Sequence, residues 1–373
     1  MNPPKVAIVG GGPSGLAVAI AARERGWDVT VFDQGHPPRD KACGEGLMPA
    51  GLQVLQSLGV LVDNELGEKF EGIRYVDSSS GGESLSAEGR FPEGEGRGIR
   101  RKVLHERMVE RARSLGADLR WGSTVKGLSG NQLLFQEHRE TFDWIVGADG
   151  LHSSVRKWAG MAGKPRGRLR YGARQHFRVA PWSPWVEVHF SADCEAYITP
   201  IGPEEVGVAL LWSGGPARYS DLLSRFPALQ ARLEGTETLS KVLGAGPLRQ
   251  EVAHVLRGPV ALVGDASGYL DAITGEGLAM SFRQAQSLVA AIDAGVPERY
   301  ISEHKAIVRP YLRMTHLVLL ATRHQWLRRR IIRALGSEPT VFSLILGAVE
   351  GQRSIQQIGV GGASRLTWRT IAG

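Results

Sequence analysis

The stretch at residues 5–15, KVAIVGGGPSG, constrains the fold of this chain more than any other part of it. Residues 6–9 form a short apolar run that ends abruptly in three glycines. An alanine-rich stretch with helical spacing then runs from about Pro13 to Gly26. This order predicts a buried parallel strand, a tight turn and a helix.

Gly10, Gly12 and Gly15 match the pattern G-x-G-x-x-G. The first glycine allows the sharp turn, the second lets a pyrophosphate approach the backbone, and the third lets helix and strand pack closely. The start of the helix, with Pro13 and Ser14, presents free N–H groups and a partial positive charge to phosphates. Taken alone, the pattern leaves an ordinary glycine-rich turn as the alternative.

Asp33 makes the nucleotide interpretation more specific. It closes a second predicted strand, residues 28–32, at about the 20-residue spacing expected after the glycines. An acid at this place accepts hydrogen bonds from the ribose hydroxyls of an adenosine and repels a 2′-phosphate. The sequence therefore predicts binding of FAD or NAD and not of NADP.

The length and composition indicate a globular protein of more than one core. A chain of 373 residues exceeds one usual core, and 42% hydrophobic with 22% charged residues is typical of soluble domains. Two cysteines argue against a disulfide framework and favour a reducing cytoplasm. We expect no signal peptide, because the first strand begins close to Met1, and no membrane span, because no apolar run reaches about 18 residues.

The chain is basic, with a net charge of +7 and a pI near 9.6. Its basic clusters, at residues 97–102, 164–170 and 323–333, are scattered among structured segments. This favours solvated faces, with attraction to an anionic cofactor or to a membrane surface as the alternatives, and does not favour nucleic acid. No C-x-x-C pair or H-E-x-x-H motif is present, so we expect no metal site.

Further along the chain, two more stretches predict a strand, a glycine turn and a helix: residues 143–156, DWIVGADGLHSSVR, and residues 260–285, VALVGDASGYLDAITGEGLAMSFRQA. Residues 70–95 predict a hairpin and residues 170–211 alternate as in an antiparallel sheet. Residues 39–47, RDKACGEGL, predict a loop, in which Lys41 is a candidate phosphate partner. We also expect strands at residues 118–121, 124–128 and 132–135, one helix at residues 221–233, and basic helices after Pro297.

Together, GGGPSG with Asp33, GADGLHSSVR and GDASGYLDAITGEGLA resemble the FAD-dependent oxidoreductases that include the aromatic hydroxylases, similar to para-hydroxybenzoate hydroxylase, and the geranylgeranyl reductases. The resemblance implies an α/β protein, α+β overall. It implies a three-layer Rossmann-like FAD-binding domain (1–69, 98–165 and 252–297), an inserted antiparallel substrate sheet (70–97 and 166–251) and a helical C-terminal region (298–373). Its motifs cover the chain only to about residue 294.

The resemblance also implies residue roles. It places the FAD pyrophosphate at the three glycines, the adenosine ribose at Asp33, the adenine at Val125 and the ribityl chain at Asp265. Asp149, the acid of the DG motif, is associated with FAD and with the passing nicotinamide cofactor. The full set of predicted cofactor-binding residues is Gly10, Gly12, Pro13, Ser14, Gly15, Asp33, Gln34, Lys41, Arg101, Val125, Asp149, Asp265, Gly275, Gly277 and Leu278.

Residues 274–277, TGEG, are expected at the flavin edge. Gly275 and Gly277 let the backbone approach, and the helix that begins near Leu278 points its positive end there. Reduction of a flavin puts negative charge near N1 and O2, which a helix N-terminus stabilises without a catalytic side chain. KACGEGL at residues 41–47 resembles the geranylgeranyl reductases, in which the cysteine lies near the flavin, and this makes Cys43 the candidate catalytic residue.

The sequence favours first an NAD(P)H-dependent monooxygenase that hydroxylates a hydrophobic or aromatic small molecule through a flavin hydroperoxide, with NADPH or NADH as a transient reductant. The alternative is a reductase similar to the geranylgeranyl reductases, which passes hydride from reduced FAD to C=C bonds of a prenyl-type lipid. KACGEGL and TGEG favour the alternative, as does contact of the basic C-terminal helices with a membrane. The substrate and the oligomeric state stay open.

Overall fold

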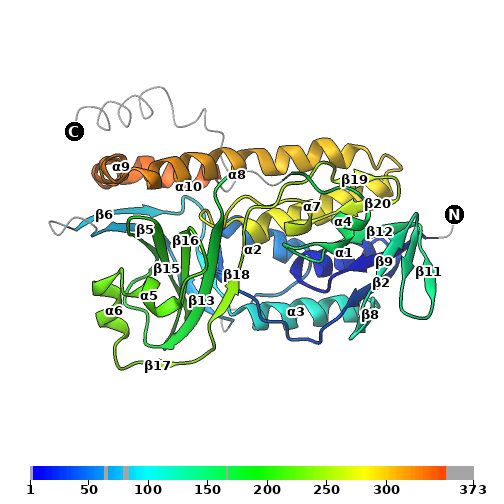
Figure 1. Ribbon diagram of the computed structural model, residues 1–373, viewed down its shortest axis with the longest axis horizontal. Coiled ribbons are helices and arrows are strands. Elements are labelled where there is room, and N and C mark those ends of the chain that lie inside the picture. The colour runs from blue at the N-terminus through cyan, green and yellow to red at the C-terminus, as the bar shows by residue number, and fades with distance from the viewer. Residues whose placement is uncertain (1–2, 63–65, 79–83, 165–166, 350–373) are drawn as a thin grey trace.

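The computed structural model describes residues 3–62, 66–78, 84–164 and 167–349 (Figure 1). One half of the molecule is built on a six-stranded sheet of order β19-β20-β12-β1-β2-β8, in which only β19 and β20 pair antiparallel. The apolar runs of β1 and its neighbours reflect burial on both faces of a parallel sheet. The strands are β1 (Lys5–Val9), β2 (Asp28–Asp33), β8 (Asp118–Trp121), β12 (Trp144–Gly147), β19 (Leu256–Arg257) and β20 (Val260–Leu262).

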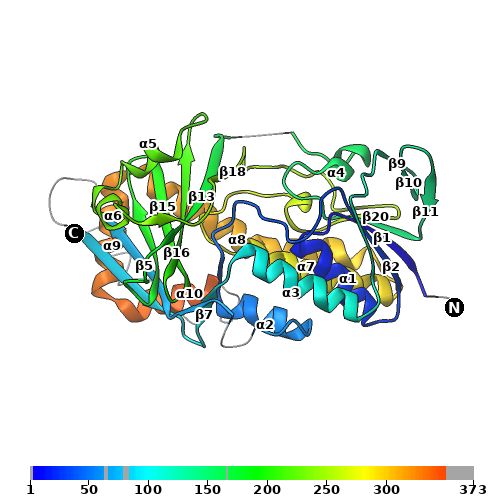
Figure 2. The same cartoon turned by 90° about the horizontal axis from the view of Figure 1, so that it is seen from below.

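Layers of different kinds cover the two faces of this sheet. Helices α1 (Pro13–Arg23), α3 (Arg101–Ser114) and α7 (Gly277–Asp293) lie side by side on one face (Figure 2). Val6 and Ile8 belong to the core on that side, whereas Ala7 and Val9 belong to the core on the other, as period-two alternation requires. The second face carries α4 (Ser154–Trp158) and an antiparallel meander of β9 (Gly127–Ser129), β10 (Gln132–Leu134) and β11 (Arg139–Thr141). The predicted three-layer arrangement is confirmed.

The other half is built on an eight-stranded sheet of order β17-β13-β16-β15-β14-β5-β6, with β18 also paired to β13. The sequence predicted a purely antiparallel sheet, but β5 and β14 pair parallel. This pairing is allowed because the chain between them is long and passes through α3 and the other sheet. The strands are β5 (Gly72–Asp77), β6 (Leu85–Arg90), β13 (Arg170–Arg178), β14 (Trp185–Phe190), β15 (Cys194–Gly202), β16 (Glu205–Ser213), β17 (Glu237–Thr238) and β18 (Leu243–Ala245).

Two smaller expectations need correction, and one short sheet was not expected. β7 (Gly96–Gly98) pairs with β3 (Gly46–Leu47) and β4 (Glu68–Phe70) in that separate sheet. The single helix expected at residues 221–233 is two, α5 (Tyr219–Leu223) and α6 (Pro227–Leu233), because Pro227 starts a helix but cannot continue one. The strand expected at residues 124–128 is β9, and it begins only at Gly127.

The C-terminal region is helical, as expected, up to the last described residue. α8 (Arg299–Arg323) runs along both halves of the molecule, and α9 (Gln325–Ser337) and α10 (Pro339–Val349) cover the hairpin of β5 and β6 (Figure 1). Residues 350–373 of the predicted region lie outside the described residues. Among the described helices, none alone has the length and hydropathy to cross a membrane, and α9 with α10 meets that test only as a pair bent by 107°.

A buried ion pair fixes α9 to the hairpin. Arg328 Nε lies 2.7 Å from Asp77 Oδ2, and the two side chains are 3% and 0% exposed. Arg328 also donates to the carbonyls of Ser191 and Thr322. The guanidinium therefore joins the end of α8, the start of α9 and the edge of the large sheet.

We expect Asp77→Asn to lower the free energy of unfolding by about 3 kcal/mol, because it leaves a buried guanidinium without its counter-charge. Thermal unfolding followed by circular dichroism, with limited proteolysis at α9, measures the effect. Glu237→Gln is the matched control, because its partner Arg178 forms an exposed pair, which contributes little. Equal midpoints for the two variants would contradict this account.

Candidate functional site

The start of α1 provides an open phosphate cradle. Gly12 is the N-cap, Pro13 follows it, and the first turn has neither an acidic residue nor a side-chain cap. A Cβ at Gly12 would meet only Arg101, whose Nη2 is 3.8 Å away. Arg101 Nε is buried and has no hydrogen-bond partner in the described part of the chain. Free N–H groups and an unused guanidinium nitrogen thus face the same space, an arrangement that fits a pyrophosphate.

The neighbouring glycines are required for packing. Gly10 has φ of +109°, and a Cβ at Gly15 would lie 1.9 Å from Gly10 O. A Cβ at Gly264 would lie 2.3 Å from Ser14 Oγ. The first turn of α1 therefore touches the 3-10 turn η1 (Gly264–Ser267), which carries Asp265. Two predicted parts of the site, 250 residues apart in the sequence, meet here.

At the adenosine end, Asp33 lies where the sequence predicts it, at the end of β2. Its carboxylate accepts the N–H of Gly11 and of Gly35, each at 2.8 Å, and pairs with Arg39 at 2.7 Å. Beside Gly11 stands Trp121, whose Nε1 is buried and, within the described residues, has no partner. Gln34 is exposed, and Val125 is half-buried in the loop before β9. Arg39 and Trp121 are the neighbours that the sequence did not reveal.

Between these ends, charged side chains collect around Asp265. Burial raises the pKa of Asp265, while Arg101, Lys41 and Arg156 act to lower it. Burial also lowers the pKa of Lys41, and Arg101 and Arg39 lower it further. Lys41 Nζ stands 3.4 Å from where a Cβ of Gly150 would be, so it reaches the turn of the DG motif. The residues around Asp265, called the predicted FAD groove below, therefore present several cations beside one acid, which suits a diphosphate joined to a hydroxylated chain.

Asp149 has a different immediate role from the one expected. Its carboxylate accepts the hydroxyl of Ser153 and the N–H groups of Ser154 (2.6 Å) and Val155 (3.1 Å), which caps α4. Arg156 of α4 then donates to the carbonyls of Asp265 and Ala266. The geometry gives Asp149 a positioning role for the turn that carries Asp265, and its direct contact with FAD stays a prediction.

The turn at residues 274–277 leads into α7 as predicted. The N-terminus of this helix, like that of α1, has no acidic residue in its first turn and no side-chain cap. Thr274 Oγ1 and Glu276 Oε1 are buried and, in the described part of the chain, form no hydrogen bond. Gly275 has φ of +72° and Leu278 is half-buried. A donor, an acceptor and a helix N-terminus are therefore available to a ligand here.

Cys43 lies close to this turn. Glu45 donates its N–H to Cys43 Sγ at 3.4 Å, and Cys43 is near enough to Tyr269 to help raise the pKa of its hydroxyl. The ring of Tyr269 in turn lies 3.6 Å from a Cβ built at Gly277. Burial raises the pKa of Cys43, with Arg101 opposing it, so the side chain is a neutral thiol. The structure thus brings Cys43 to the predicted flavin edge.

The sequence prediction missed a buried polar network that holds the loop of Cys43. Glu45 Oε2 lies 2.6 Å from His176 Nε2, and its Oε1 accepts the N–H of Arg101 at 2.8 Å. Arg174, which is 1% exposed, donates to Asp40 and to the carbonyl of Lys41. Two polar side chains two residues apart on a buried strand were the available signal, but their partners lie more than 130 residues away.

Glu276 generates a pH-dependent prediction. Burial raises its pKa from 4.5 to about 7, with Arg283 opposing this. A raised carboxyl pKa stabilises the fold below pH 4.5, and this stability is lost as pH rises through about 7. We expect Glu276→Gln to raise the free energy of unfolding by up to about 3 kcal/mol at pH 8.5 and to leave it unchanged at pH 4. Thermal unfolding at both pH values checks this, with Glu237→Gln as an exposed control; a gain independent of pH would contradict it.

Asp265 generates a prediction about cofactor affinity. Asp265→Ala removes an acceptor in the groove, and we expect FAD to bind about tenfold more weakly or worse. Flavin absorbance of the purified variant and titration of the stripped protein with FAD measure this. Asp193→Ala, which removes an exposed acid of the other half, is the control. Full flavin content at low FAD concentration would refute the role.

Comparison with known proteins supports these assignments at the level of the family. The FAD binding domain family matches residues 4–200, more than half of the chain. The menaquinone reductase of Mycolicibacterium smegmatis is 25% identical over 73% of the chain and 72% of its own length. The digeranylgeranylglycerophospholipid reductase of Methanosarcina acetivorans is 27% identical over 73% and 71%. The FAD-dependent monooxygenase OpS4 of Beauveria bassiana is 26% identical over 64% and 62%.

Among solved structures, a flavoprotein/dehydrogenase from Cytophaga hutchinsonii superposes with a TM-score of 0.82, at 15% identity, over 99% of this chain and 98% of that one. At this identity the likeness concerns the fold alone. The fold and the family match agree with the cradle, the acid-bearing groove and the unpartnered polar atoms described above. The chain belongs to the FAD binding domain family and is an FAD-dependent oxidoreductase of the superfamily that contains monooxygenases and geranylgeranyl reductases.

Proposed function

We propose that this protein is a reductase that adds two hydrogens across a C=C bond of a prenyl-type lipid. The observation that carries the proposal is the position of Cys43, a neutral thiol in the KACGEGL loop that lies within electrostatic reach of Tyr269, whose ring lies beside Gly277 of the flavin-edge turn. Relatives named as reductases of menaquinone and of digeranylgeranylglycerophospholipid support it, because each matches nearly three quarters of the chain.

A C=C reduction needs a hydride at one carbon and a proton at the other. FAD, when bound, supplies the hydride chemistry, and the protein has to supply the proton. Cys43 and Tyr269 are both protonated at neutral pH, because burial raises the pKa of each. The N–H of Glu45 fixes the Sγ atom, and the network of Glu45, His176 and Arg174 fixes the loop. In this proposal Cys43 donates the proton and Tyr269 positions the thiol.

NADH or NADPH is the proposed source of electrons. The chain contains a single G-x-G-x-x-G pattern, in the turn from β1 into α1, which the FAD occupies in this proposal. A nicotinamide cofactor would therefore bind transiently, without a dinucleotide cradle of its own. The acid Asp33 does not discriminate between the two, because it belongs to the FAD site.

A monooxygenase acting on a hydrophobic or aromatic molecule is the second candidate. The sequence pattern favours it first, and the match to the monooxygenase OpS4 supports it, over a smaller share of the chain than the reductases cover. The two candidates use the same cofactor and differ in whether the product gains oxygen or hydrogen. They are therefore separated by the mass of the product.

We expect the holoenzyme, reduced without oxygen by NADH or NADPH, to convert a polyprenyl quinone or a geranylgeranyl lipid to a product heavier by two hydrogens. Mass spectrometry of the extracted lipid measures this. The same reaction run in air is the control. A product heavier by one oxygen, formed only in air, would establish the monooxygenase instead.

For Cys43→Ser we expect kcat to fall at least about tenfold, because a serine hydroxyl is a far weaker acid than the thiol. FAD content should be unchanged, since Cys43 contributes no charge to the groove. Cys194→Ser is the matched control, because Cys194 is a buried cysteine of the large sheet, remote in sequence from the loop. Unchanged turnover in Cys43→Ser would return Cys43 to a structural role.

We also propose that the end of α8 and the start of α9 contact an anionic membrane, from which a lipid substrate is taken. Leu317, Leu320 and Trp326 are 61%, 50% and 61% exposed there, and Arg330 lies over the Trp326 ring. Residues 304–337 contain eight lysines and arginines and no acid, and six of these cations remain when Arg328 and Arg329, which pair with Asp77, are left out. Exposed apolar side chains among cations are typical of a surface that lies on anionic lipid.

We expect the double variant Leu320→Ser, Trp326→Ala to float with phosphatidylglycerol vesicles several-fold less than the native protein. The apolar contact area is lost while the charge stays constant, and this separates insertion from simple attraction. Leu61→Ser is the control, because Leu61 is 76% exposed in the other half of the molecule. Equal flotation of all three proteins would refute the membrane surface.

A further inference from the structure

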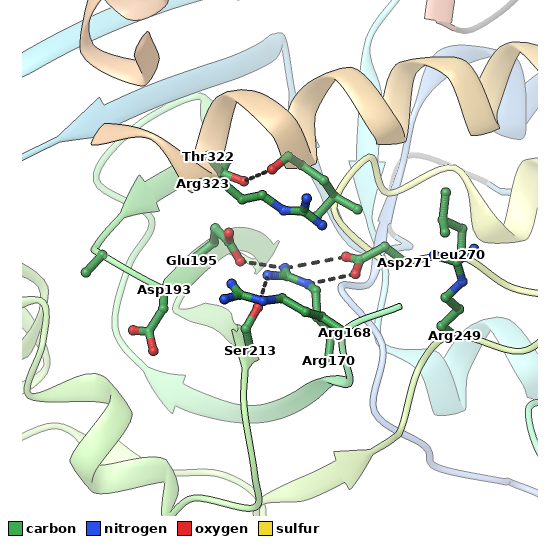
Figure 3. A pocket seen from close by; sticks show the side chains of 12 residues that line it. Arg168, Arg170, Asp193, Glu195, Ser213, Arg249, Leu270, Asp271, Thr322 and Arg323 are labelled. Atoms are coloured by element: carbon green, nitrogen blue, oxygen red, sulfur yellow. Dashed lines mark hydrogen bonds and ion pairs between the residues drawn. The ribbon is translucent and has the colours of Figure 1, made fainter. Parts of the chain in front are cut away.

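A charged cavity of about 90 Å³ lies between the large sheet and α8, outside the FAD groove (Figure 3). Its walls come from the start of β13, the turn into β15, the end of β16, the loop before α7 and the last turns of α8. Four arginines and three acids line it, with two leucines at its side. They are Arg168, Arg170, Arg249, Arg323, Asp193, Glu195, Asp271, Leu270 and Leu319.

The acids in this cavity are engaged by arginines. Arg170 donates to Asp271 Oδ2 and to Glu195 Oε2, both at 2.7 Å, and the dashed lines in Figure 3 mark this bridge. Asp193 pairs with Arg225. The carboxylates are therefore already paired within the protein, and the bridge that Arg170 makes to Asp271 and Glu195 forms the floor of the cavity.

Two guanidiniums above this floor have no such partner. Arg168 and Arg323 are both exposed, and within the described residues neither has a hydrogen bond or an ion pair. Figure 3 shows both reaching toward Arg170 from different elements, the segment before β13 and the end of α8. Arg249, paired only with Glu251, stands at the rim. Like charges held together without counter-ions make a site for an anion.

We propose that this cavity binds the anionic end of the substrate, a phosphate or diphosphate group. A single guanidinium already satisfies both oxygens of a carboxylate, whereas two or three converging guanidiniums match the larger number of oxygens on phosphate. The proposal extends the proposed function by naming the polar end of its prenyl-type substrate.

The position of the cavity suits a substrate with an apolar chain. Leu270 and Asp271 of its wall directly follow Tyr269, whose ring lies against Gly277 at the flavin-edge turn. Leu319 of the cavity and Tyr269 pack against the same apolar cluster of Leu211, Leu248 and Ile273. An anion in the cavity is thus joined by apolar side chains to the place where Cys43 lies. Arg323 of its wall lies between Leu320 and Trp326 of the proposed membrane surface in the sequence.

Isothermal titration of the FAD-loaded protein with inorganic diphosphate tests the site directly, without turnover. We expect saturable binding in the native protein. The affinity should be about tenfold weaker in Arg168→Gln and, as a separate variant, about tenfold weaker in Arg323→Gln. Arg113→Gln, an exposed arginine of α3, is the matched control and should bind as the native protein does. Flavin absorbance and the thermal midpoint establish that each variant is folded.

A second arm distinguishes the source of the phosphate. If it belongs to a membrane lipid, Arg168→Gln, which leaves α8 unchanged, reduces flotation with phosphatidylglycerol vesicles; if it is borne by a soluble molecule, flotation is unchanged. Absence of diphosphate binding by the native protein, or equal binding by the control and both cavity variants, would overturn the proposal. Anion binding without C=C reduction would overturn the proposed function and leave the site standing.

Discussion

The buried carboxylate of Glu45 connects the parts of this molecule on which its chemistry depends. One oxygen accepts the first N–H of α3, which belongs to the FAD-binding half, and the other meets His176 on the large sheet. A buried charge of this kind carries a large desolvation penalty unless it is fully paired, and loss of one partner is strongly destabilising. The loop of residues 39–47 is therefore held between the two halves. This fixes the positions of its own residues Lys41 and Cys43.

The fixed loop of residues 39–47 also contributes side chains to two parts of the predicted FAD site, the phosphate part and the flavin part. Arg101 borders the phosphate cradle of α1 and acts on the pKa values of both Lys41 and Cys43, and Cys43 acts in turn on Tyr269, whose ring lies beside Gly277 at the start of α7. Helices α1 and α7 both begin without a side-chain cap, and we predict that their free N–H groups bind different parts of the dinucleotide. In this assignment the cations Arg101 and Lys41 belong to the phosphate part of the site, and the protonated groups of Cys43 and Tyr269 belong to the flavin part.

The basic character of the chain divides in a similar way. Part of the positive charge lies around Asp265, part lies in the acid-free stretch of residues 304–337, and part converges on the cavity below α8. The net charge of the chain does not distinguish these three groups of basic residues, because every arginine contributes the same charge to the total. Which arginines have partners and which do not is what distinguishes a structural guanidinium such as Arg170 from a binding one such as Arg168.

The sequence by itself determined the order of βα units, the glycine turns and the place of Asp33 and Asp265, because these depend on local patterns of apolar residues and on backbone conformations that only glycine adopts easily. Only the tertiary structure decided the parallel pairing of β5 with β14, the capping role of Asp149 and the pairing of Glu45 with His176. Strand pairing and buried ion pairs join residues far apart in the chain, and no local pattern specifies which of several equivalent partners is chosen. The arginine cavity is the clearest case, since its guanidiniums come from three separate stretches that meet only when α8 lies across the sheet.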